Sequence, residues 1–416
     1  MEQTKAKRKR HSKFLSALLA VCVVFSGGGM TVPVQADAEQ TEQNTIVNGA
    51  LWYDDRGENI QGHGGNILEY EGRYYWVGEY KENANFSGIA LYSSSDLADW
   101  KFENMILTPD TPDDDGTIGF CTIERPKLIF NGSEFVLWAH WENGKDYGES
   151  KLIVAKCDTV NGDYEFVNRF NPKSKTYNAE TGEYEITTNR SLDMTIYNDT
   201  ETDADGTVHN QAYLISANGH NMALYKLTQD CMDVIPEESY QFWIGAGREA
   251  PALVKSGDYY VLVTSGQSGW YPNQSMYGYT KDITDPNGWT PADELKTIGN
   301  NSTFYSQPTN IAAIGDGQYI YMGDRWNPGA LGKSTFVWLP LNIEAGEEGV
   351  TASMDYVDAW SFNAGSGKVE LPDSELVSQG KTVEASVAGS DAHPVEQAVD
   401  GIRDTTSEWG NSNYFA

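Results

Sequence analysis

A hairpin pattern that recurs five times along this chain constrains its fold more than any other feature. Each copy consists of an apolar strand, a turn that contains glycine, and a second strand rich in aromatic residues. The turn glycines are residues 72, 132, 206, 257 and 317, so successive turns lie 60, 74, 51 and 60 residues apart. This spacing is typical of the blades of a β-propeller.

The residues between the hairpins also favour an all-β body. Between Asn44 and Phe362 no apolar stripe of helical period exceeds two turns, whereas Tyr, Trp, Val and Ile recur in short runs. We therefore predict a five-bladed β-propeller over residues 45–362. A β-sandwich is the alternative, because its strands also recur roughly every 8 to 12 residues, but it would not repeat one hairpin at intervals of about 60 residues.

The first 36 residues are typical of a secretion signal. Six Lys or Arg side chains precede an apolar run of 12 residues, 14–25, and residues 34–36 form a cleavage site of the small-residue type. The run is shorter than the roughly 20 residues that span a bilayer. We expect a cleaved signal peptide and a secreted protein, extracellular or associated with the cell surface; a retained anchor helix is the alternative.

The character of the chain changes after Phe362. Residues 363–375 are predicted to be a linker, because they begin with a run of Gly, Ser and Asn. Segments 385–388, 393–401 and 405–409 resemble the opening of a discoidin-like carbohydrate-binding module. We expect residues 376–416 to be an incomplete β-sandwich of this kind, because 41 residues are too few to bury such a core alone.

Charge narrows the class of ligand. The chain carries 60 Asp and Glu against 29 Lys and Arg, a formal net charge of −31. An acidic surface repels phosphate backbones and anionic headgroups, so nucleic acid and membrane surfaces are poor partners. We expect no membrane insertion after signal cleavage, and a neutral, ring-shaped ligand.

One polar residue stands upstream of each hairpin. In a propeller the innermost strand of every blade starts near the axis, so residues at this point converge on one funnel. The five residues are His63, Glu124, Asp193, Glu249 and Gln307. Such side chains are costly to bury unless they share partners or a ligand. We predict a funnel for acid–base chemistry; a water-filled channel lined by satisfied side chains is the alternative.

Longer motifs extend from these positions. They span residues 124–131, 191–194, 248–251, 265–273, 306–309, 321–326 and 334–341. Together they resemble glycoside hydrolase family 43, and within it the exo-β-1,3-galactanase branch. The resemblance implies a five-bladed propeller that releases galactose from non-reducing ends of β-1,3-galactan with inversion. A family relative acting on arabinofuranosides or other galactosides, and a non-catalytic glycan-binding propeller, are the alternatives.

The resemblance also implies catalytic roles. Glu249 corresponds to the general acid, and Asp193 to a carboxylate that raises the pKa of that acid. The usual catalytic Asp of the family falls at Gly64 here, and the resemblance implies that Gln307 positions the attacking water instead. Because an inverting pair leaves room for water, we expect Glu249 and Gln307 to face each other across about 6.5 to 9.5 Å.

Sugar binding requires hydroxyl partners and flat apolar faces. Glu124 is implied to bind a sugar hydroxyl, although it stays open as the base. Trp141 is a further aromatic candidate, whereas His140 and His220 are predicted to be structural. The resemblance matches Ser268 and Trp270 to the substrate loop of the branch. The expected substrate-binding set is Glu124, Tyr147, Ser268, Trp270, Trp326 and His63.

Two acidic runs, residues 113–115 and 199–206, raise the question of calcium. The second lacks the closing Glu of an EF-hand loop, and its Asp-Gly pair is itself a turn signal. We expect solvated turns, no cofactor and no catalytic metal, with structural calcium as the alternative.

Overall fold

The fold is seen in a computed structural model, which describes residues 45–82, 85–178, 180–199, 201–204, 208–315, 317–371 and 382. These residues belong to one unit, Gln43–Ala416. The predicted signal peptide lies outside the described residues, as does the predicted discoidin-like module apart from residue 382. None of the described segments forms a helix long and apolar enough to cross a membrane.

Four of the five hairpins extend into four-stranded antiparallel sheets. The first sheet contains β2 (His63–Tyr70), β3 (Arg73–Glu79), β4 (Ile89–Ser94) and β5 (Lys101–Leu107). The second contains β6 (Thr122–Phe130), β7 (Phe135–Glu142), β8 (Lys151–Cys157) and β9 (Glu165–Phe170). The fourth contains β18 (Arg248–Ser256), β19 (Tyr259–Gly266), β20 (Met276–Thr280) and β21 (Lys296–Thr297). The fifth contains β22 (Gln307–Ile314), β23 (Gln318–Arg325), β24 (Thr335–Gly346) and β25 (Gly349–Ser353).

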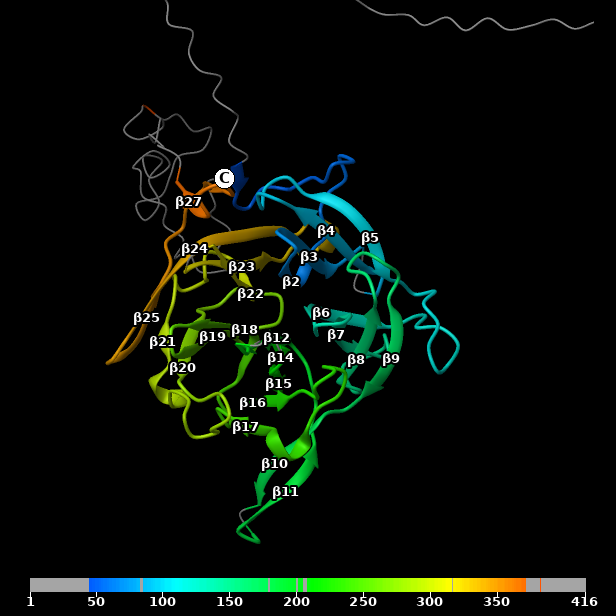
Figure 1. Cartoon of the computed structure of the whole chain (residues 1–416), viewed down its shortest axis with the longest axis vertical. Helices are drawn as coiled ribbons and strands as arrows, with labels where there is room; N and C mark the ends of the chain where they lie inside the picture. Colours follow the sequence, from blue (N-terminus) through cyan, green and yellow to red (C-terminus); the bar gives the residue numbers. More distant parts are fainter. Residues whose placement is uncertain are drawn as a thin grey trace, which may run out of the picture. The chain divides into compact units, whose positions relative to one another are not determined.

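The third blade is larger. Its strands are β12 (Met194–Asn198), β15 (Ala212–Asn218), β16 (Asn221–Lys226), β17 (Tyr240–Phe242), β10 (Lys173–Asn178) and β11 (Glu183–Thr188), in that spatial order. The β10–β11 hairpin joins the outer edge through one parallel pairing with β17 and projects away from the other blades (Figure 1). A small hairpin of β13 (Glu201–Thr202) and β14 (Val208–His209) lies between β12 and β15 in the chain. These additions account for the uneven spacing around the third turn.

The five sheets close into a ring. Each innermost strand, in the order β2, β6, β12, β18 and β22, contacts the next, and β22 contacts β2 (Figure 1). No single sheet closes on itself, so the ring is made by packing between separate sheets. The five-bladed β-propeller is therefore confirmed. Its turns need glycine, because Gly72 and Gly317 have φ angles of 73° and 72°, a region that side chains disfavour.

The two ends of the propeller pair with each other. Strand β1 (Thr45–Val47) pairs antiparallel with β26 (Ala359–Asn363). The next residue, Asn48, accepts a hydrogen bond from the Trp338 backbone N–H of β24 at 2.6 Å. Within the predicted linker, β27 (Lys368–Glu370) pairs with β26, and residues 364–367 form the turn between them.

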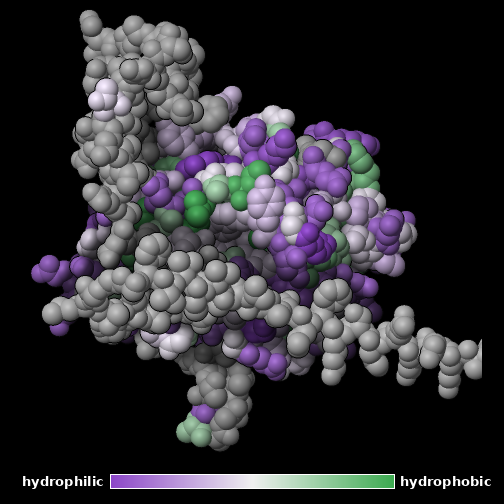
Figure 2. Space-filling view, turned by 90° about the horizontal axis from the view of Figure 1, so that it is seen from above, coloured by the Kyte–Doolittle hydropathy of each residue, from purple (hydrophilic) through white to green (hydrophobic). Residues whose placement is uncertain are grey.

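Aliphatic and aromatic residues from several strands of each blade fill the spaces between blades. Each of five hydrophobic clusters lies between two neighbouring blades. Between the first and fifth blades, the Trp76 ring lies 4.7 Å from the Trp338 ring and 4.8 Å from the Phe336 ring. Short 3-10 turns, η1 (Pro236–Glu238), η2 (Ala292–Glu294) and η3 (Leu331–Lys333), lie in the connections. The face in Figure 2 is largely hydrophilic, with small hydrophobic patches.

Candidate active site

The inner strands are irregular where the site begins. Four of them carry a shift of register, between His63 and Asn66, Glu124 and Lys127, Glu249 and Ala252, and Pro308 and Asn310. Within three of these irregularities the φ angles are positive, 65° at Gly64, 55° at Arg125 and 51° at Ala250. A β-bulge re-aims the neighbouring side chains and is often found at active sites. We infer that the bulges turn Glu124 and Glu249 towards the axis.

A cavity of about 250 Å³ lies at the axis. This volume is below the roughly 300 Å³ at which sites for drug-sized ligands begin, and it suits a single sugar ring. Seven predicted site residues line it: Glu124, Tyr147, Asp193, Glu249, Trp270, Gln307 and Trp326. The remaining lining residues are Glu79, Lys81, Arg125 and Gly269. The predicted convergence of Glu124, Asp193, Glu249 and Gln307 is therefore present.

The environment of Glu249 keeps its carboxyl group protonated. Burial, followed by the negative charge of Asp193, raises its pKa to about 8, although Arg125 and a backbone N–H of Ser268 act in the opposite direction. Arg125 also donates a hydrogen bond from Nη2 to Asp193 Oδ2 at 3.0 Å. Asp193 therefore lies near Glu249 and forms an ion pair with the guanidinium of Arg125.

The amide of Gln307 has one possible orientation. Its Oε1 accepts hydrogen bonds from Arg125 Nη2 at 2.6 Å and from Trp326 Nε1 at 2.8 Å. Arginine and tryptophan side chains can only donate, so the amide oxygen must face them. The amide nitrogen then donates to Glu249 Oε1 at 3.1 Å.

The expected gap of 6.5 to 9.5 Å between Glu249 and Gln307 is therefore wrong for this structure. The rule behind it describes two carboxyl groups with a water between them. An amide N–H and a carboxyl oxygen attract each other instead, and Arg125 and Trp326 turn the amide nitrogen towards Glu249.

A lysine joins two carboxylates on another side of the cavity. Lys81 Nζ lies 2.7 Å from Glu79 Oε2 and 3.1 Å from Glu124 Oε1. Burial disfavours the charge of Glu124, but Lys81 and then His140 outweigh it and hold the pKa of Glu124 well below its usual range. The hydroxyl of Tyr147 donates to Glu124 Oε2 at 3.1 Å. Glu124 therefore stays ionised and oriented.

A carboxylate occupies the space beside Gly64. A Cβ added at Gly64 would lie 2.2 Å from Glu79 Oε1, a distance that atoms in contact do not reach. Glu79 Oε1 also accepts a hydrogen bond from the Arg125 backbone N–H at 2.9 Å. Burial is the largest cause of a raised pKa at Glu79, and Lys81 partly offsets it. Position 64 thus has no room for a side chain while Glu79 stands there.

Two indole rings form an apolar wall. Trp270 and Trp326 meet edge to face with ring centroids 5.1 Å apart, and Lys81 Nζ lies 5.5 and 5.7 Å from the two rings. Tyr147 is 50% exposed. Trp141, in contrast, is buried in the cluster between the first two blades, with the Arg169 guanidinium 4.3 Å from its ring. The expectation that Trp141 faces the ligand is corrected.

Two predicted binding residues lie outside the cavity wall. His63 is fully buried; its Nδ1 lies 3.1 Å from Asp324 Oδ1, and its ring stacks on Phe336 with centroids 4.7 Å apart. Ser268 Oγ donates to the Tyr271 carbonyl oxygen at 2.5 Å, so its hydroxyl closes the substrate loop. Ser268 contributes to the site through its backbone N–H, which interacts with the Glu249 carboxyl group.

The second strands of four hairpins supply residues that the sequence analysis did not assign to the site. Four of them are cross-strand partners of predicted site residues: Glu79 opposite His63, His140 opposite Glu124, Ser265 opposite Glu249, and Asp324 opposite Gln307. They follow the turn glycines by 7 or 8 residues. Counting forward from each glycine as well as backward would have found them, because directly opposed side chains lie on the same face of a sheet.

Residues of the two acidic runs form ion pairs with basic side chains of the protein. Asp113 and Asp115 pair with Arg169 at 3.1 and 2.8 Å, and Asp199 pairs with Lys255 at 2.8 Å. Within the part of the chain that the structure describes, no three His, Cys, Asp or Glu side chains are grouped to hold a metal ion.

Known proteins with related sequences and folds are glycosidases. The profile of glycosyl hydrolases family 43 matches residues 61–322. An exo-β-1,3-galactanase from Clostridium thermocellum is similar at 35% identity and a TM-score of 0.67, over 79% of this chain and 69% of that one. The exo-β-1,3-galactanase of Phanerochaete chrysosporium, solved with galactose, is similar at 31% identity and a TM-score of 0.65, over 79% and 71%. A search of curated proteins found no match.

Proposed function

Because the chain belongs to glycosyl hydrolases family 43, we propose that it is a secreted exo-β-1,3-galactanase that releases galactose from non-reducing ends of β-1,3-galactan with inversion. The observation that carries the proposal is that Glu249, whose pKa is raised to about 8, lies beside Asp193, which is paired with Arg125, in a cavity for a single sugar ring. The two similar exo-β-1,3-galactanases support the substrate. The predicted signal peptide supports secretion.

In this proposal Glu249 is the general acid. It donates its proton to the glycosidic oxygen while the bond from that oxygen to C1 of galactose breaks. A pKa of about 8 keeps the proton available at neutral pH. The carboxylate that remains is stabilised by Arg125 and by the Ser268 backbone N–H, the groups that already favour its ionised form.

Gln307 holds the attacking water by donating a hydrogen bond to it. Its oxygen is occupied by Arg125 and Trp326, so only the amide nitrogen is available. When the glycosidic oxygen engages Glu249, the bond from that nitrogen to Glu249 is released for water. An amide is a weak base, so Gln307 does not accept the proton that the water loses. That proton passes to an ionised carboxylate of the cavity. The contribution of Gln307 is positioning.

Galactose binding falls to the other side of the cavity. The ionised Glu124 accepts hydrogen bonds from sugar hydroxyls, Tyr147 adds a phenol, and Trp270 and Trp326 pack on the apolar face of the ring. All four line the cavity. The discoidin-like module proposed for residues 376–416 would add affinity for the polysaccharide.

A product screen tests the function. The protein is incubated with β-1,3-galactan, β-1,3-galactobiose and an aryl arabinofuranoside, and released sugars are separated by chromatography. We expect galactose from the first two and no arabinose. Binding without hydrolysis on overnight incubation would indicate a non-catalytic glycan-binding propeller instead of an enzyme. The absence of an Asp at position 64 favours this alternative. Release of arabinose would move the substrate to arabinofuranosides.

A further inference from the structure

A buried histidine lies between two carboxylates behind the sugar-binding side of the cavity. His140 is on β7, and only 1% of its surface is exposed. Its Nε2 lies 3.0 Å from Glu142 Oε1 and its Nδ1 lies 3.7 Å from Glu124 Oε2. A neutral imidazole has one N–H, so its second nitrogen would present a lone pair to a carboxylate. Only the imidazolium, which donates from both nitrogens, suits both neighbours.

Glu142 anchors the C-terminal end of the loop that carries Tyr147. Its Oε1 accepts a hydrogen bond from the Ser150 backbone N–H at 3.0 Å, and its Oε2 accepts one from the Glu149 backbone N–H at 2.9 Å. Farther along the loop, Arg190 Nη2 donates to the Tyr147 carbonyl oxygen at 2.8 Å. The Tyr147 hydroxyl then reaches Glu124. Residues 143–150 are therefore held at their C-terminal end by Glu142 and in their middle by the contacts of Tyr147.

We propose that His140 is a positioning residue, whose imidazolium joins the loop anchor Glu142 to the sugar-binding Glu124 and so keeps Glu124 and Tyr147 in their binding geometry. It does not line the cavity and would not touch the sugar. This inference rests on the proposed function of the cavity. It predicts that loss of His140 weakens substrate binding and leaves the proton transfer from Glu249 intact.

The charges around His140 favour its protonated form. The groups that face it are Glu124 of β6, Glu142 of its own strand and Tyr147, whose ring centroid lies 5.8 Å away; Lys81 is paired to the far oxygen of Glu124. Burial disfavours the charge, but the two carboxylates outweigh it and raise the pKa of His140 to about 9. The bridge therefore persists at neutral pH and is lost as the pH rises through about 9.

Steady-state kinetics of the full chain test the inference. For His140→Gln, we expect KM for β-1,3-galactobiose to rise roughly 10- to 100-fold, the worth of a hydrogen bond to a charged group, while kcat changes less than about threefold. Glu142→Gln should act in the same direction. Glu165→Gln, an exposed position on β9 of the same blade, is the matched control. In the wild type KM should rise above about pH 9, and this rise should be absent in His140→Gln.

Two measurements do not depend on galactan hydrolysis. NMR of labelled histidine in the wild type should show both nitrogens of His140 protonated at pH 7.5. Amide hydrogen exchange over residues 143–150 should be at least about tenfold faster in His140→Gln. A neutral His140 at pH 7.5, unchanged exchange, or an unchanged KM in the folded variant overturns the inference. If His140→Gln does not fold, Glu142→Gln and the wild-type titration decide. A wild type that does not cleave galactobiose refutes the proposed function separately.

Discussion

Replacing Glu249 by glutamine removes the acidic proton that the carboxyl group can transfer and changes the shape of the side chain little. Glutamine has the same shape, and its amide can still meet the Gln307 side chain that donates to Glu249 Oε1 at 3.1 Å. The structure gives the size of what is lost. With a pKa of about 8, about 90% of the Glu249 carboxyl groups are protonated at pH 7, against about 0.3% for a carboxyl at the ordinary value of 4.5. The site therefore enriches the proton donor about 300-fold.

The loss should depend on the leaving group. For Glu249→Gln we expect kcat on β-1,3-galactobiose to fall by about 10² to 10⁴, because the sugar leaving group needs a proton. The phenolate of an aryl galactoside leaves without being protonated, so kcat on that substrate should fall far less. In the wild type, kcat/KM should fall as the pH rises above about 8, because Glu249 of the free enzyme loses its proton there.

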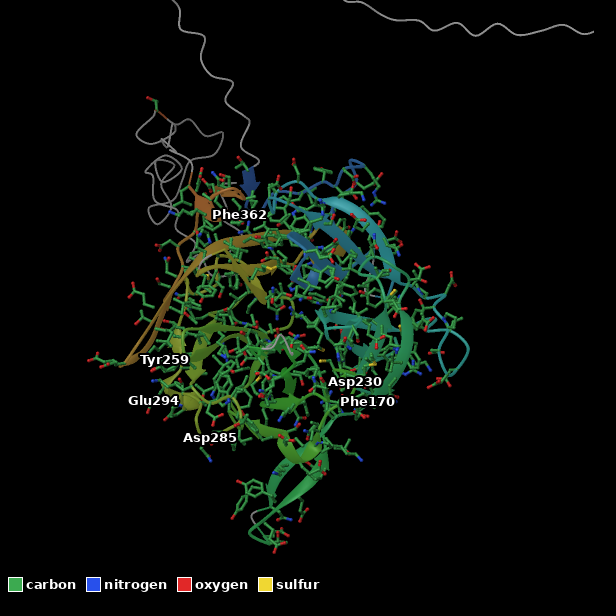
Figure 3. All side chains as sticks on the ribbon, in the orientation of Figure 1. Phe170, Asp230, Tyr259, Asp285, Glu294 and Phe362 are labelled. Carbon is green, nitrogen blue, oxygen red and sulfur yellow. The ribbon has the colours of Figure 1, made fainter. Side chains whose placement is uncertain are left out.

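The assay compares galactose release from galactobiose with phenolate release from the aryl galactoside. Glu294→Gln, at an exposed position at the rim in Figure 3, is the matched control and should behave as wild type. Equal losses on the two substrates, or a kcat/KM that stays flat to pH 10, would refute the assignment of Glu249 as the acid.

Three further predictions concern the groups around the acid. Asp193→Asn removes the negative charge that raises the pKa of Glu249, so the alkaline limb of the kcat/KM profile should move down by about one to two pH units; an unmoved limb would contradict the coupling. Gln307→Ala should lower kcat at least about 100-fold because the attacking water is no longer held, and a near wild-type rate would remove Gln307 from the mechanism. Gly64→Ala should lower the free energy of unfolding by about 1 to 3 kcal/mol, measured by denaturant titration, because its Cβ would lie 2.2 Å from Glu79 Oε1 at a φ of 65°; unchanged stability would contradict this packing.

The blades were readable from sequence because each one repeats a turn glycine after an apolar strand. The β10–β11 hairpin was not, because most of its residues are exposed or half-buried, its tyrosines and isoleucine included, and so carry no core pattern. It joins the sheet through a single parallel pairing, Lys175 to Tyr240, between residues far apart in the chain. Such a contact leaves no local signal.

The site was predictable to the extent that it follows the period of the fold. Glu124, Asp193, Glu249 and Gln307 lie 8, 13, 8 and 10 residues before their turn glycines and reach one cavity. His63 lies 9 residues before Gly72 but turns towards Asp324 and Phe336, because Glu79 takes the space beside the bulge at Gly64.

The orientation of the Gln307 amide was beyond sequence reasoning. It depends on donors from two other parts of the chain, Arg125 and Trp326. Their convergence appears only when the blades are assembled.

The most direct test of the central claim is NMR of β-1,3-galactobiose during its first minutes with the enzyme. An exo-acting, inverting galactanase must release free galactose, and the new galactose must first appear as the α-anomer before mutarotation mixes the two forms. We predict an early α-anomer signal that disappears in Glu249→Gln. Early β-galactose would contradict inversion, and the absence of any released galactose from the folded wild-type protein would contradict the proposed activity itself.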